Sequence, residues 1–105
     1  MREQDFELVR GELLRLLEEL VVAEHAALHR DLLGEDWSPP RAYRWIRYES
    51  EDPIGALISA SLRLDEEWRG HEEKPGAVTL HSRLREEEAE RLARALELAR
   101  VLGYR

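Results

Sequence analysis

Two histidines stand four residues apart near the end of a long apolar stretch, and a carboxylate precedes them. His25 and His29 would share one face of a helix, with Glu24 beside them. Imidazoles at this spacing can share a zinc ion if at least one more ligand is near, and His71 or His81 could supply it only if the fold brought them close. We predict ordinary surface or interface histidines and leave a metal-bound pair as an open alternative.

A basic and aromatic segment is the second candidate for chemistry. Residues 37–50 carry three arginines against one glutamate, in a chain whose net charge is -7. Arginines interleaved with flat rings can pair phosphates and stack the bases of a single strand. The other interpretation, which we prefer because the whole chain repels phosphate, has the rings in the core and the arginines paired with acids. The candidate nucleic-acid contacts are Arg41, Tyr43, Arg44, Trp45 and Arg47.

No other pattern points to catalysis or to a bound cofactor. The chain has no cysteine, no G-x-G-x-x-G and no P-loop, and no G-x-S-x-G surrounds Ser59 or Ser61. The glutamates between residues 86 and 90 are typical of a solvated helix face, whereas acid–base catalysis needs a sheltered carboxyl group. We therefore assign no catalytic, cofactor-binding or metal-binding residue and expect a protein that is not an enzyme.

The amino-acid composition limits which partners and which cellular location we expect. The acidic balance argues against a nucleic-acid coat and against anionic membranes. Residues 1–20 do not resemble a secretory leader, and no run of eighteen apolar residues exists, so we expect a cytoplasmic protein without a membrane span. Lys74 is the only lysine against fifteen arginines, and asparagine is absent, which suits a thermophile.

Residues 3–33 are predicted to form one long helix, which Gly34 ends. Thirty-one residues would span about 46 Å, whereas a compact monomer of this size has a radius of gyration near 13 Å. The rest of the chain would struggle to cover such a helix, so we predict a homodimer. Apolar residues at alternating spacings of three and four would form its interface: Phe6, Val9, Leu13, Leu16 and Leu20.

The rest of the chain is predicted to complete a single α+β domain, residues 1–105. Residues 34–41 would be a connector, residues 42–82 a small antiparallel sheet of about three strands, and residues 84–102 a helix. The strands would be Ala42–Glu49, Gly55–Asp65 and Ala77–Ser82. Residues 54–66 also fit a helix that starts at an Asp52 cap and Pro53, so an all-α four-helix arrangement stays open.

The order of elements in residues 46–98 resembles the strand–helix core of the positive cofactor four family of single-strand-binding coactivators. That resemblance implies a twisted sheet and a helix that dimerise and bind melted DNA. The chain departs from the family in being acidic, in inserting residues after Leu80, and in having a long helix where that family has a basic tail. The resemblance is carried by Ile46-Arg47-Tyr48, Leu62-Arg63-Leu64, Trp68, Lys74-Pro75-Gly76 and Val78-Thr79-Leu80.

Two main expectations about function follow, and a small metal-dependent enzyme that uses His25 and His29 is a third hypothesis. The first is a small non-enzymatic intracellular protein, a dimeric protein-interaction or structural domain with a protein partner. The alternative is a single-stranded nucleic-acid-binding protein that uses the basic and aromatic strand. The sequence identifies neither the partner nor the pathway.

Overall fold

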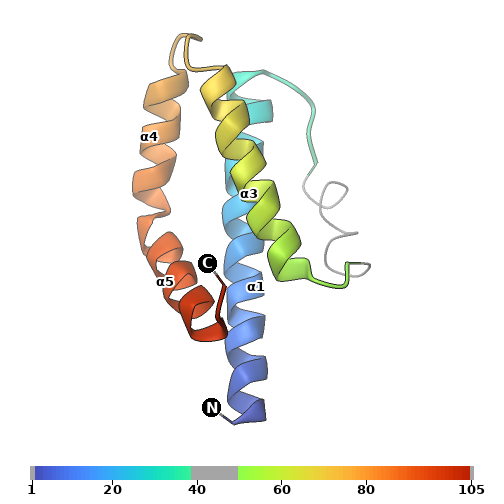
Figure 1. Ribbon diagram of the computed structural model, residues 1–105. Helices are drawn as coiled ribbons and strands as arrows, with labels where there is room; N and C mark the ends of the chain where they lie inside the picture. The colour runs from blue at the N-terminus through green and yellow to red at the C-terminus, as the bar shows by residue number, and fades with distance from the viewer. Residues whose placement is uncertain (1, 39–49, 105) are drawn as a thin grey trace.

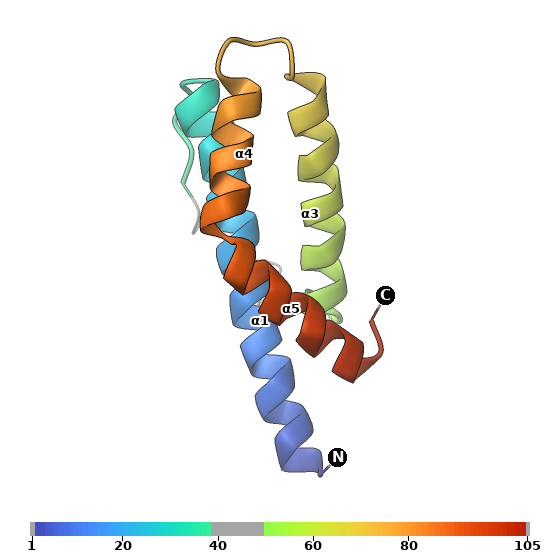
Figure 2. The same ribbon diagram turned by 90° about the vertical axis from the view of Figure 1, so that its left-hand side faces the viewer.

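The computed structural model describes residues 2–38 and 50–104, and every regular element within them is a helix (Figure 1). In chain order these are α1 (Glu3–Ala26), the π-helix η1 (Ala27–Leu32), α3 (Pro53–Gly70), α4 (Ala77–Glu87) and α5 (Ala89–Leu102). The molecule is elongated, with extents of 49 × 27 × 18 Å. α1 runs along its length, with α3 on one side and α4 followed by α5 on another (Figures 1 and 2).

The predicted α+β class is wrong, and the all-helical alternative fits the described residues. Residues 55–65, expected to be a strand, lie inside α3. The side chain of Asp52 accepts a hydrogen bond from the Gly55 backbone N–H at 3.1 Å, and Pro53 occupies the first turn. These start signals combine with a buried stripe at helical spacing. The stripe consists of Ile54, Leu57, Ala60, Leu64 and Trp68.

The expected strand Ala77–Ser82 lies in α4, which follows Gly76 in the left-handed region with φ of 81°. Residues 84–102, expected as one helix, are divided between α4 and α5 by a break at Glu88. The helical conformation of residues 62–64 and 78–80 removes the sheet that the resemblance to the positive cofactor four family required. The first predicted strand, Ala42–Glu49, lies outside the described residues.

Two apolar clusters hold the helices together, and α1 contributes to both. One cluster joins α1 and η1 to α3, and the partly buried Leu80 and Leu84 of α4 pack against it. The other joins the middle of α1 to the start of α3 and to α5, through Leu13, Ile54 and Leu98 among others. Burial of such apolar surface is the main source of stability in a domain of this size. Among the described helices, none combines the length and the apolar character needed to cross a bilayer.

Candidate metal centre

Glu24 is a carboxylate on the apolar stripe of α1. It follows Leu20 by four residues and precedes Leu28 by four, so helical periodicity turns it toward the core. Its residue surface is only 8 % exposed, and it is the one charged residue among the buried residues that the structure describes. One carboxylate oxygen, Oε2, is buried without a hydrogen-bond partner. A buried polar atom of this kind requires an explanation, because leaving it unpaired costs free energy.

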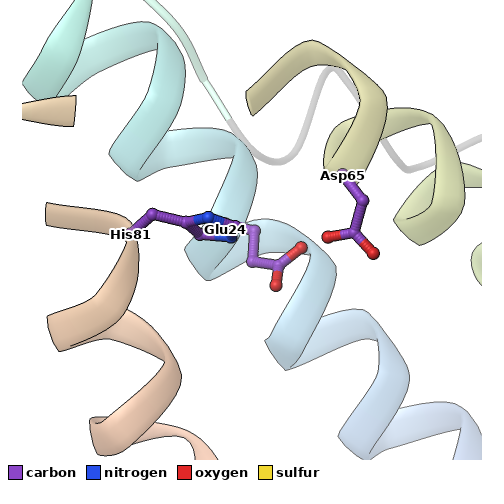
Figure 3. Close-up of side chains that lie close together, drawn as sticks. All are labelled: Glu24, Asp65 and His81. Carbon is purple, nitrogen blue, oxygen red and sulfur yellow. The ribbon is translucent and has the colours of Figure 1, made fainter. Parts of the chain in front are cut away.

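Two further ligand groups from other helices lie beside Glu24. Asp65 belongs to α3 and His81 to α4, and both are only partly buried. One ligand atom from each of the three side chains lies within 4.8 Å of the other two. Figure 3 shows the Glu24 carboxylate between the imidazole of His81 and the carboxylate of Asp65. Among the described residues, this is the one group of three or more potential metal ligands so close together.

The guanidinium of Arg85 reaches all three groups from the next turn of α4. Its Nη2 pairs with Asp65 Oδ1 at 2.5 Å, and its Nε lies 3.5 Å from Glu24 Oε1. The same Nε donates a hydrogen bond to His81 Nε2 at 3.4 Å. His81 Nε2 therefore turns its lone pair toward the cluster, which assigns the ring proton to Nδ1.

The protonation states follow from this environment. Burial raises the pKa of Glu24 to about 7; Arg85 opposes the rise, whereas Asp65 and Glu88 add to it. Burial and then Arg85 lower the pKa of His81, against the pull of Asp65. His81 is thus held as neutral imidazole, the form that binds a metal ion.

The predicted histidine pair forms a separate cluster. The rings of His25 and His29 lie 4.5 Å apart between centroids, and Trp37 lies 4.6 Å from His25. His29 Nδ1 is 2.7 Å from Glu35 Oε2, and its Nε2 is 3.1 Å from Glu67 Oε2. Both nitrogens of His29 thus face carboxylates, an arrangement that suits an imidazolium ion better than a metal ligand.

The other predicted site residues are placed as follows. Leu13, Leu16 and Leu20 of the expected dimer interface are buried in the chain's own core. Val9 is partly buried, and Phe6 keeps 42 % of its surface exposed. The candidate nucleic-acid contacts Arg41, Tyr43, Arg44, Trp45 and Arg47 lie outside the described residues.

The sequence analysis placed Glu24 beside His25 and His29, and it named His81 only as a possible additional ligand for that pair. It missed Asp65 and Arg85 altogether. The available signal was a glutamate at a core position of an otherwise apolar helical stripe, since charged residues are rarely buried without a partner or a metal. Comparisons of the chain with protein-family models, curated proteins and solved structures find no match.

Proposed function

We propose that the protein binds a divalent transition-metal ion through Glu24, Asp65 and His81. The observation that carries this proposal is the buried Oε2 of Glu24, which has no partner and belongs to a cluster of three ligand groups. A metal ion would satisfy this oxygen and would offset the free energy that its burial costs. The proposal thus explains why a carboxylate occupies a core position of α1.

The charge of the cluster favours a cation. Two carboxylates meet there, and a third, Glu88, is near enough to raise the pKa of Glu24. Among the described residues, Arg85 is the one cation in contact with all three ligand groups, while Glu88 is paired with Arg91 at 3.0 Å. The cluster therefore has an excess of negative charge when Glu24 is ionised, and a dication would balance it.

The donor set suggests the class of ion. One imidazole and two carboxylates suit zinc or manganese better than magnesium or calcium, which prefer oxygen ligands alone. Three protein ligands would leave a coordination position for water. His81 also lines a pocket of about 310 Å³ between α3 and α4, which offers an ion a path from solvent. We propose binding rather than catalysis, because all three titratable groups would be engaged as ligands.

Titration of the tag-free, chelator-dialysed protein with Zn²⁺, Mn²⁺ and Mg²⁺ tests this proposal. Calorimetry should show one site for Zn²⁺ or Mn²⁺ and negligible binding of Mg²⁺. His81→Ala and Asp65→Asn should remove that binding, whereas His71→Ala, on a histidine outside the cluster, should retain it. Absence of a stoichiometric site in the wild type would refute the proposal, as would equal binding by the His81 and His71 variants.

Self-association is a second candidate, favoured by the amino-terminal end of α1. This end extends beyond α5 in both views (Figures 1 and 2), and it exposes 42 % of Phe6 and 73 % of Leu8. A second copy of the chain could cover these side chains, in keeping with the expected dimer and with a cytoplasmic interaction protein. Light scattering after gel filtration should then give twice the monomer mass, and Phe6→Glu should give the monomer. A monomeric wild type at high concentration would exclude this candidate.

A further inference from the structure

Arg85 contacts all three ligand groups of the cluster. Its guanidinium contacts one ligand atom from each of the three side chains, at distances of 2.5, 3.4 and 3.5 Å. Two of these atoms are carboxylate oxygens, and the third is the imidazole nitrogen Nε2 of His81, whose lone pair accepts the Arg85 N–H. Arg85 is thus the cation that the three ligand groups share.

A guanidinium and a dication cannot both occupy this space. Ligand atoms around a tetrahedral ion at about 2.1 Å stand roughly 3.4 Å apart, and those of the cluster all lie within 4.8 Å of one another, close enough to share one cation. A metal ion that bound all three ligand atoms would therefore lie where the guanidinium contacts them. Like charges at such short range also repel strongly in a partly buried site.

The side chain of Arg85 can leave the cluster toward solvent. Its side chain is 39 % exposed, and it belongs to the last turn of α4, just before the break at Glu88. Asp65 and Glu24 are less exposed than Arg85, with side-chain exposures of 30 % and 10 %. A rotamer change of the arginine alone would therefore open the site and leave the ligands in place.

We infer that Arg85 is a built-in counter-ion that holds the empty site together and is displaced when the metal ion binds. This inference rests on the proposed metal-binding function and specifies how the site is regulated. Without a cation, Glu24 and Asp65 would repel one another within the core. Arg85 supplies that cation until metal is available. The measured metal affinity would then reflect the replacement of the Arg85 guanidinium by the metal ion.

Substitution of Arg85 by glutamine tests whether Arg85 competes with the metal ion or helps the site to bind it. Glutamine keeps a polar, flexible side chain but removes the competing charge, so the Arg85→Gln variant should bind Zn²⁺ about tenfold more tightly or better. The matched control is Arg83→Gln on the same helix, because Arg83 lies outside the cluster and its substitution should leave the affinity unchanged. If Arg85→Gln binds Zn²⁺ equally or more weakly while the wild type binds it, the proposed displacement of Arg85 is wrong, but the proposed metal site is retained.

A second measurement needs no variant. In the wild type, the Nε–H resonance of Arg85 should move on Zn²⁺ addition to the position of a solvent-exposed arginine. A resonance that stays unchanged while the metal binds would overturn the inference, even if Arg85→Gln proved unable to fold. If neither the wild type nor Arg83→Gln nor a folded Arg85→Gln variant binds metal, the proposed function fails together with this inference.

Discussion

The imidazole of His81 lies flat against the indole of Trp68, with ring centroids 4.5 Å apart and planes inclined by 4°. Trp68 comes from α3 and is 2 % exposed, so it forms a rigid wall that fixes the orientation of the α4 histidine. Stacking of this kind adds modestly to the energy of burial but strongly limits ring rotation. The aromatic pair thus holds Nε2 of His81 toward Glu24 and Asp65.

This contact makes Trp68 a reporter of metal binding. A Trp37→Phe/Trp45→Phe variant retains Trp68 as its single tryptophan. Zn²⁺ should change the fluorescence of Trp68, and the change should saturate at one equivalent of metal. The physical reason is that a metal ion on His81 places positive charge beside the stacked indole. Emission that stays constant while calorimetry detects binding would place the metal ion away from His81.

Substitution of Glu24 by glutamine should change the folding stability and the metal binding of the protein in opposite directions. The variant removes the buried charge, which is unfavourable at pH 8 because burial raises the pKa of Glu24 to about 7, and we expect the metal-free protein at that pH to gain about 1 to 2 kcal/mol in unfolding free energy. The same variant should lose its metal site, a trade-off that is typical of functional residues.

Urea denaturation would measure this change, with the exposed Glu7→Gln on the same helix as the control. The control should change stability by less than about 0.5 kcal/mol. A large loss of stability in Glu24→Gln would instead mean that the ionic contact with Arg85 stabilises the fold by more than the burial of the carboxylate costs.

The sequence left the structure of residues 54–66 open for a physical reason. Two patterns overlap in this segment. Every even-numbered residue from 54 to 64 is apolar, as in a strand, while Ile54, Leu57, Ile58 and Leu62 also fall at the spacing of a helical stripe. The helix forms because the Asp52 cap and Pro53 start it, and because Trp68 extends the stripe beyond the usual length of a strand. Greater weight on the cap would have predicted α3 correctly.

The candidate metal site was only partly predictable. Glu24 could be recognised as a carboxylate on an apolar stripe, but Asp65 stands in the acidic run Asp65-Glu66-Glu67 and has no local mark. Its meeting with His81 depends on how α3 and α4 pack along α1, which no local pattern specifies. That His25 and His29 share one face of a helix follows from their spacing alone, and their ring centroids lie 4.5 Å apart.

Leu13 provides a test of the core that joins α1 to α5. It has no exposed surface and packs with Ile54 and Leu98 inside one chain. Leu13→Ala should therefore cost about 2 to 5 kcal/mol of unfolding free energy. Leu62→Ala, on a residue of α3 that is 62 % exposed, is the matched control and should cost less than about 0.5 kcal/mol. If the cost of Leu13→Ala depended on protein concentration, its burial would arise between chains instead.

The contacts of His29 predict how stability varies with pH. Burial alone would lower the pKa of His29, but hydrogen bonds to Glu35 and Glu67, followed by the charges of the same carboxylates, outweigh it and raise the pKa above 6.5. The folded protein therefore holds this proton more tightly than the unfolded chain does. The stabilisation is complete below pH 6.5 and is lost as the pH rises through the raised value.

Comparison of the wild type with His29→Gln isolates this effect from the other titrating groups. Glu24 also has a raised pKa, and His25 and His81 have lowered values, so the pH profile of the wild type alone mixes opposite slopes. The stability difference between the two proteins, measured by urea denaturation, should be largest at acidic pH and should shrink above pH 6.5. The ring C–H resonances of His29 should titrate at higher pH than those of His25. A difference that grows with pH would mean that His29 is held neutral by its neighbours, contrary to its two carboxylate contacts.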